Sequence, residues 1–277
     1  MVHEAHLPTT PTLTISSVSA VLRLNRPRQH NRIELEDIAV LGEILTRVEC
    51  DSEVRVLVLT AGGPTFCAGY DIGALAEGLV TDGHPGGEGS FADLVDRIED
   101  LRVPTICALQ GSVYGGGTDI ALACDFRIGA RGIRMLMSAS RLGVHYYYGG
   151  LRRYAERLGL GPAKRLFLSA QPVDANEMLR IGFLDEVVPE EALVSRVEEV
   201  ASGLAAQAPG AIQGMKAALN RIARGTADPS EIDAAWLASL RSADVAERLS
   251  AWTEGRLPAF RGADSPSAAG RNAAIRG

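Results

Sequence analysis

Two glycine-bearing segments of this chain carry the residue types and spacing that could do chemistry. One runs from Phe66 to Ile72 and the other from Gly111 to Asp119. Each follows an apolar run typical of a buried strand, and each is expected to open a helix. A glycine turn at a helix start leaves backbone N–H groups unpaired and pointing outward. Two such turns side by side could direct two N–H groups at one oxygen atom, which stabilises an enolate or a tetrahedral oxyanion without a metal or a cofactor. The pattern therefore predicts an enzyme.

The elements that must position these turns follow from the spacing of apolar residues. Val54 to Leu59 and Thr105 to Leu109 are short apolar runs, which predict strands buried on both faces directly before the two turns. Repetition of strand, turn and helix implies parallel crossover units and an α/β layer fold. Between the turns, Gly78 to Ser90 is expected to be a mobile loop. From about Tyr146 the pattern becomes helical, and its last helix is expected over Pro229 to Thr253.

Composition excludes several classes of protein. The 277 residues carry a net charge of −6, which argues against a protein built to bind nucleic acid or anionic membranes. The first residues show no secretory signal, and no apolar stretch is long enough to span a bilayer, so we expect a cytoplasmic protein. The four cysteines form no C-x-x-C pair and no histidine stands at metal-ligand spacing, so we expect neither disulfides nor a metal site.

The two segments resemble the two signatures of the crotonase (enoyl-CoA hydratase/isomerase) superfamily. The further similar stretches are Leu24–Pro27, Leu142-Gly143 with Gly149-Gly150, Ile181–Val188 and Glu254–Phe260. The resemblance covers about residues 12 to 262 and implies the ClpP/crotonase fold, an α/β fold. Its repeated β-β-α core would occupy residues 12–190, a helical C-terminal oligomerisation section residues 191–262, and flexible tails residues 1–11 and 263–277.

The resemblance also implies which backbone groups bind the substrate. The amides of Tyr70 and Gly116 would form an oxyanion hole around the carbonyl of an acyl-CoA thioester. CoA is part of this substrate, and no further cofactor is implied. The residues implied in CoA binding are Arg28, Phe66 and Ala68 from the same chain, and Arg256 and Phe260 reaching the site of a neighbouring subunit. This arrangement fits the family's homotrimers and homohexamers. Arg28 could equally be a solvated surface charge.

The acid–base residues depart from the hydratase pattern. Hydration of an enoyl thioester uses two carboxylates to hold and deliver one water. The first falls at Asp119, one methylene shorter than the usual glutamate, and Ala139 stands where the second is expected. The segment from Ser138 to Tyr146 is instead similar to the methylmalonyl-CoA decarboxylase branch, which implies that Tyr146 lies near the reacting carbon and that Ser138 assists. As an alternative, Tyr146 to Tyr148 could simply wall an apolar acyl pocket.

Three functions therefore stay open. The first is a crotonase-type lyase acting on an acyl-CoA thioester through a stabilised enolate, grouped with enoyl-CoA hydratases and isomerases. The second, on the same fold, is a decarboxylase of a malonyl- or methylmalonyl-type thioester. The third is a CoA-binding subunit without chemistry of its own. The carboxylate at Asp119 argues against the third, because a site without chemistry would have little reason to keep it.

Overall fold

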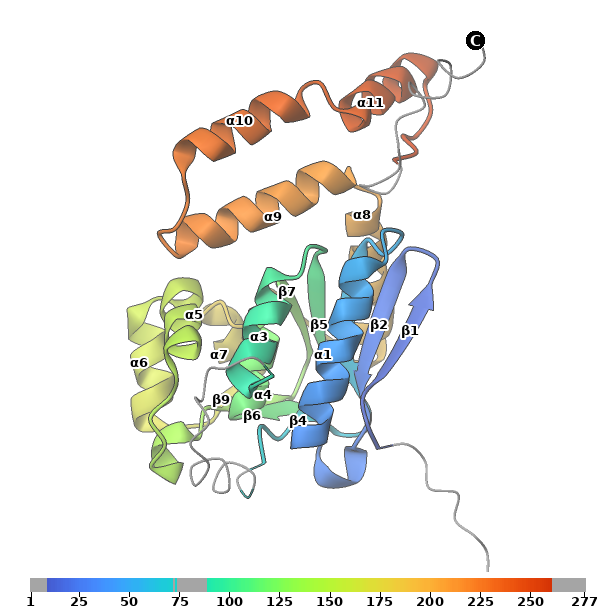
Figure 1. Ribbon diagram of the computed structural model, residues 1–277. Coiled ribbons are helices and arrows are strands. Elements are labelled where there is room, and N and C mark those ends of the chain that lie inside the picture. The colour runs from blue at the N-terminus through green and yellow to red at the C-terminus, as the bar shows by residue number, and fades with distance from the viewer. Residues whose placement is uncertain (1–8, 72, 74–88, 261–277) are drawn as a thin grey trace, which may run out of the picture.

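Two β-sheets form the core of the computed structural model, which describes residues 9–71, 73 and 89–260 (Figure 1). The larger sheet has the strand order β1-β2-β3-β5-β7-β10 and is parallel except for the β1–β2 hairpin. Its strands are Thr12–Ser16 (β1), Ser19–Leu24 (β2), Val56–Ala61 (β3), Thr105–Leu109 (β5), Phe126–Ala130 (β7) and Glu186–Val188 (β10). The smaller sheet has the order β4-β6-β8-β9, with strands Thr65–Cys67, Ser112–Tyr114, Arg134–Leu136 and Val173–Asp174.

The chain passes repeatedly from the larger sheet to the smaller one. β3 leads into β4, β5 into β6 and β7 into β8, and the β4–β6 and β6–β8 pairs are parallel. At the corner between β5 and β6, a Cβ atom on Gly111 would lie 2.2 Å from the carbonyl oxygen of Pro64, so only glycine fits there. Helix α4 (Gly116–Ala123) follows β6 directly. The predicted α/β class with repeated β-β-α units is confirmed.

Amphipathic helices cover the larger sheet. Helix α1 (Leu35–Cys50) buries Ile38, Leu41, Leu45 and Val48, which recur at helical spacing on one face. It lies beside α3 (Phe91–Asp100) in front of the sheet in Figure 1. The remaining helices of this part are α5 (Tyr148–Leu158), α6 (Leu160–Ser169) and α7 (Ala175–Arg180), with short 3₁₀ turns at Pro27–Gln29, Ala139–Leu142 and Glu190–Ala192.

The C-terminal helices divide into one that joins the core and three that lie beyond it. Helix α8 (Leu193–Ala205) packs on the larger sheet and buries Leu193, Val197, Ala201 and Ala205 in the core. Helices α9 (Pro209–Ala223), α10 (Pro229–Ser239) and α11 (Ala243–Glu254) lie together at the top of Figure 1. The contacts that tie this group to the core include that of Lys216, whose Nζ lies 2.7 Å from Asp125 Oδ2 and donates to the carbonyl of Val103.

The single long helix predicted over Pro229 to Thr253 was wrong, because two helices occupy that stretch. The backbone N–H of Ser242 donates to the carbonyl of Ser239, closing a turn after α10. The Ser242 hydroxyl then accepts from the N–H of Val245 at 3.3 Å and caps α11. A serine in an otherwise helical run thus marks a new helix start.

Some predictions fall outside the described residues. The expected mobile loop over residues 78–90 is described only at Gly89 and Ser90, and the helix expected after the first glycine turn only at Gly73. The expected flexible tails lie outside the described residues except for positions 9–11. None of the described helices is long and apolar enough to cross a membrane.

Candidate active site

The two glycine turns bring the backbone amides of Tyr70 and Gly116 together. Gly69 and Asp71 use their backbone groups to pair with Ile33 in a parallel bridge, so the amide of Tyr70 points away from that bridge. Gly116 is the first residue of α4, where backbone N–H groups lack partners within the helix.

The distances place both amides at one small space. A Cβ atom on Gly116 would lie 3.4 Å from Tyr70 N, and one on Gly69 would lie 3.1 Å from Gly116 N. Gly69 has φ +94°, a left-handed conformation that favours glycine. The two amides therefore border one position at the positive end of α4. An oxygen atom at that position could accept a hydrogen bond from each amide.

Asp119 lies one turn further along α4, on the same face as Gly116, and is fully buried. Its Oδ1 accepts from Arg153 Nη1 at 2.6 Å. Its Oδ2 accepts from the hydroxyls of Tyr146 at 3.1 Å and of Tyr147 at 2.5 Å. Both carboxylate oxygens are thus engaged by side chains from the segment around α5.

Both tyrosines are held as protonated hydrogen-bond donors. Burial raises the pKa values of Tyr146 and Tyr147 well above the usual range of a phenol, and the adjacent charge of Asp119 raises both values further. The ring of Tyr146 lies 4.9 Å from that of Tyr147 and 5.2 Å from that of Phe167. A Cβ atom on Gly150 would lie 2.2 Å from Tyr146 Cε1, so glycine at position 150 makes room for the ring.

Arg153 is completely buried and faces three carboxylates. Besides Asp119, its Nη2 contacts Asp96 Oδ1 at 2.5 Å and its Nε lies 3.3 Å from Glu99 Oε1. Burial alone would raise the pKa of Glu99, but Arg153 and other arginines outweigh it and lower that pKa to about 2. Glu99 is therefore an anion at neutral pH that anchors the guanidinium.

Comparison with known proteins decides the family. The family model described as enoyl-CoA hydratase/isomerase matches residues 14–263. The chain belongs to the enoyl-CoA hydratase/isomerase family. A short-chain-enoyl-CoA hydratase of Clostridium acetobutylicum is 35% identical over 204 residues, which are 73% of this chain and 77% of that protein. A carnitinyl-CoA dehydratase of Citrobacter koseri is 34% identical over 252 residues, which are 87% of this chain and 94% of that protein.

Solved structures agree with the family assignment. The crystal structure of an enoyl-CoA hydratase from Bacillus anthracis has a TM-score of 0.82 and 28% identity, and the match covers 91% of this chain and 99% of that one. The predicted crotonase fold and the predicted lyase activity of crotonase type on an acyl-CoA thioester are confirmed. The resemblance to the methylmalonyl-CoA decarboxylase branch stays a prediction.

Ser138 lies close to the second amide of this enoyl-CoA hydratase/isomerase family member. A Cβ atom on Gly115 would lie 3.3 Å from Ser138 Oγ, so the hydroxyl lies beside the residue that precedes Gly116. Ala139 is buried at the start of a 3₁₀ turn and brings no carboxylate to the position where a second one was expected. The site thus has one carboxylate at the two motif positions, and that carboxylate is ion-paired.

The residues predicted for CoA binding lie in two separate places. The N–H of Ala68 donates to the carbonyl of His30, which places Ala68 beside the 3₁₀ turn that carries the exposed Arg28. Phe66 is fully buried, backbone included, so it offers a ligand no surface, whereas Ala68 is exposed. The chain after α11 lies at the opposite end of the molecule in Figure 1.

The C-terminal pair of predicted CoA contacts has partners of its own at that opposite end. Arg256 pairs with Glu247 and Glu254, and the carbonyl of Phe260 accepts from Arg55 at the start of β3. Within one chain, Arg256 and Phe260 are therefore not brought to Arg28.

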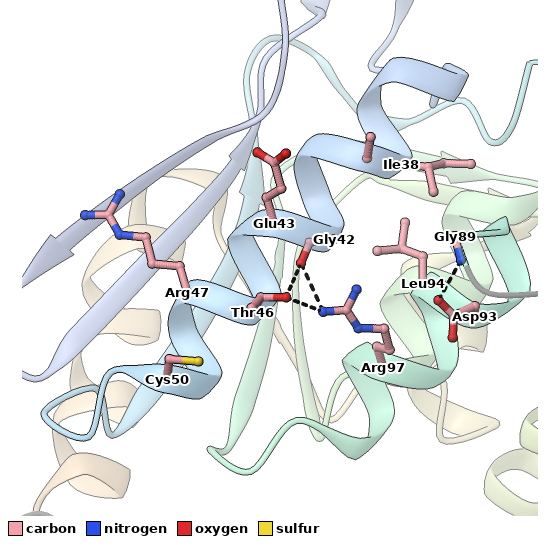
Figure 2. Close-up of a pocket in the computed structure, with 11 residues that line it drawn as sticks. Ile38, Gly42, Glu43, Thr46, Arg47, Cys50, Gly89, Asp93, Leu94 and Arg97 are labelled. Atoms are coloured by element: carbon pink, nitrogen blue, oxygen red, sulfur yellow. Dashed lines mark hydrogen bonds between the residues drawn. The ribbon is translucent and has the colours of Figure 1, made fainter.

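A groove of about 540 Å³ between α1 and α3 lies apart from these residues (Figure 2). Arg97 crosses it from α3 and donates to the carbonyl of Gly42 and to the hydroxyl of Thr46. Its lining includes none of the residues predicted for catalysis or CoA binding. No cluster of three or more His, Cys, Asp or Glu side chains suited to a metal ion occurs among the described residues.

Tyr147 and Arg153 are the site residues that sequence reasoning missed. A signal for Arg153 exists, because Gly150, Arg153, Tyr154 and Leu158 form the buried face of α5 at helical spacing. An arginine on such a face must find buried anions. No comparable signal separates Tyr147 from its neighbour Tyr148, which is 81% exposed.

Proposed function

We propose that this enzyme decarboxylates an acyl-CoA thioester that carries a second carboxylate on its α-carbon, of malonyl or methylmalonyl type. The observation that carries the proposal is the engagement of both Asp119 oxygens by Arg153, Tyr146 and Tyr147. Hydration needs a carboxylate free to take and return a proton of water. Decarboxylation needs no strong base, so an occupied Asp119 and an alanine at position 139 are compatible with it.

The proposed reaction runs through a thioester enolate. The bond between the α-carbon and the carboxylate breaks, its electron pair moves into the thioester, and CO₂ leaves. The amides of Tyr70 and Gly116 hold the resulting oxyanion, and each such donor is worth about 3–4 kcal/mol of transition-state stabilisation. The α-carbon then takes a proton from water. We assign no proton transfer to Tyr146, because burial and Asp119 raise its pKa well above its usual range.

Tyr146 acts in this proposal on the leaving carboxylate. Its hydroxyl proton is committed to Asp119, so the lone pairs of its oxygen remain for the substrate side. Lone pairs facing a carboxylate disfavour its charge, and that penalty disappears as neutral CO₂ forms. Ser138 lies beside Gly115 and would support the same end of the substrate.

CoA binding in this proposal involves two subunits. Arg28 and the backbone of Ala68 hold the adenosine and phosphates, and the neighbouring subunit contributes its Arg256 and Phe260; the fully buried Phe66 is given no contact with CoA. Support comes from the three outer helices, where Leu219 is 64%, Trp236 60% and Trp252 78% exposed. Apolar surface of this kind marks an interface, so we propose a homotrimer or homohexamer. Light scattering that returned the mass of a monomer would refute this part.

A second candidate, hydration or dehydration, is favoured by the identity to the Clostridium and Citrobacter proteins. One experiment separates the two. Purified enzyme is incubated with malonyl-CoA, methylmalonyl-CoA and crotonyl-CoA, while CO₂ release and the loss of enoyl absorbance are followed. We expect CO₂ release and no appreciable hydration. Faster hydration of crotonyl-CoA overturns the proposal, and tight thioester binding without either reaction supports a non-catalytic subunit.

Two variants sharpen this test. Tyr146→Phe removes the hydroxyl that faces Asp119, and we expect CO₂ release to fall about tenfold or more. The matched control is Tyr148→Phe, because Tyr148 lies two positions away and is 81% exposed. Equal effects of the two substitutions would contradict the role given to Tyr146.

A further inference from the structure

Arg153 is a charged side chain without any exposed surface, and its environment is built to keep it there. An unpaired guanidinium in the interior would cost several kcal/mol. Here Glu99, a residue of α3 that is 3% exposed, contacts the guanidinium, and so does Asp96 one turn earlier on the same helix. These two anions of α3 hold the arginine, and its Nη1 contacts Asp119 of α4.

We infer that Arg153 is a positioning residue, which holds the carboxylate of Asp119 in one orientation. The hydroxyls of Tyr146 and Tyr147 are thereby both kept as donors to this carboxylate. The inference deepens the proposed function and rests on it in one respect, namely that Tyr146 faces the substrate. Arg153 itself is given no contact with the substrate.

The division of the two carboxylate oxygens carries the argument. Arg153 takes Oδ1, and both tyrosine hydroxyls donate to Oδ2. A carboxylate only accepts hydrogen bonds, so each hydroxyl must donate to it and turn its lone pairs elsewhere. Without the guanidinium, Oδ1 would lose its partner, and nothing named here would stop the carboxylate from turning about its Cβ–Cγ bond. Oδ2 would then no longer be held in place for the two tyrosine hydroxyls.

The chain offers a matched control for Arg153 at the preceding position. Arg152 lies on the same helix and pairs with the same Glu99 at 2.5 Å and with Glu156 at 2.5 Å. None of its hydrogen bonds or ion pairs reaches Asp119. Arg152→Met therefore removes a comparable ion pair with Glu99 while leaving the contact with Asp119 in place.

The test is a double-mutant cycle on positions 119 and 153. We expect Arg153→Met to lower kcat at least about tenfold with little change in KM, and Arg152→Met to leave kcat close to that of the wild type. In an Asp119→Asn background, the further loss from Arg153→Met should largely vanish, because the carboxylate that it holds is absent. Losses that multiply in the double variant, or an equal loss from Arg152→Met, would overturn the inference.

A second variant keeps the inference testable if Arg153→Met does not fold. Arg153→Lys keeps one positive charge but replaces the planar guanidinium, which reaches Asp96, Glu99 and Asp119 together, by a single ammonium group. The near-ultraviolet circular dichroism of the substrate-free enzyme reports how rigidly the tyrosine rings are held, and we expect Arg153→Lys to change it and Arg152→Lys to leave it as in the wild type. Equal spectra for Arg153→Lys and the wild type would refute the inference. This readout needs no turnover, so its failure is distinct from an absence of CO₂ release.

Discussion

Replacing Gly116 by alanine tests the paired amides directly, because no side-chain substitution can delete a backbone N–H. The new Cβ atom would lie 2.8 Å from Phe91 Cζ and 3.4 Å from Tyr70 N. The first distance is shorter than any relaxed carbon contact, so the Phe91 ring must move. The second places a methyl group beside the amide to which the thioester oxygen should bind.

The magnitude follows from these distances. An oxyanion must lie about 3 Å from both donors, and a methyl group beside Tyr70 N prevents it from reaching the two nitrogens together. Loss of one donor costs about 3–4 kcal/mol, which lowers kcat roughly 10²- to 10³-fold. Displacing Phe91 adds about 1–3 kcal/mol of packing strain to the folded protein. The kinetic loss should therefore come with a modest loss of thermal stability.

The assay compares kcat, thermal unfolding and binding of the CoA thioester in Gly116→Ala and Gly161→Ala. Gly161 is the control because a Cβ atom there, in α6, meets no atom within 4 Å. Adding Phe91→Leu to Gly116→Ala should restore stability but not kcat, since the methyl group stays beside Tyr70 N. A folded Gly116→Ala enzyme with kcat within about threefold of the wild type would refute the oxyanion role.

Three further outcomes follow from burial and charge. The arginines that hold the pKa of Glu99 at about 2, against an ordinary 4.5, contribute stability that is present above pH 4.5 and lost as the pH falls toward 2. Glu99→Gln should lack this acid-dependent part of the free energy of unfolding, which is about 3 kcal/mol. Urea denaturation of both proteins between pH 2 and 4.5 measures it. A Glu99→Gln protein with the pH dependence of the wild type would contradict this role of Glu99. Burial raises the pKa of the Cys67 thiol to about 12, so mass spectrometry after mild alkylation should find the exposed Cys50 modified and Cys67 unmodified; early labelling of Cys67 would contradict its burial. Gly150→Ala places a Cβ atom 2.2 Å from the Tyr146 ring and should lower both kcat and the melting temperature, and wild-type values for both would disprove that close approach.

The sequence was sufficient for the parts of the site that depend on local backbone chemistry. Glycine turns after apolar strands predicted two segments that present backbone amides, because such turns are decided within a few residues, and the family resemblance assigned those amides to Tyr70 and Gly116. The strands before them, β3 and β5, lie where the apolar runs were. Helix boundaries were harder to predict, even though they also depend on local sequence. The Ser242 hydroxyl caps α11, so two helices occupy the stretch where one was predicted.

The state of Asp119 could not be predicted in the same way. Its role depends on Arg153 and on the anions behind it, which come from helices far apart in the sequence. Spacing within one helix shows which residues share a face, but it does not show which face another helix presents to it. Sequence reasoning therefore identified a carboxylate, and only the packing of α3, α4 and α5 showed that both its oxygens are engaged.

The ion pair also resolves an electrostatic conflict within α4. The amide of Gly116 and the positive end of the helix favour a developing oxyanion, whereas a bare carboxylate on the same face one turn later would oppose it. In a buried site this repulsion is poorly screened. The guanidinium of Arg153, 2.6 Å from Asp119, offsets part of that charge, although Asp96 and Glu99 share the same guanidinium. A carboxylate can therefore fix two tyrosine hydroxyls here with less opposition to the oxyanion, because a buried arginine accompanies it.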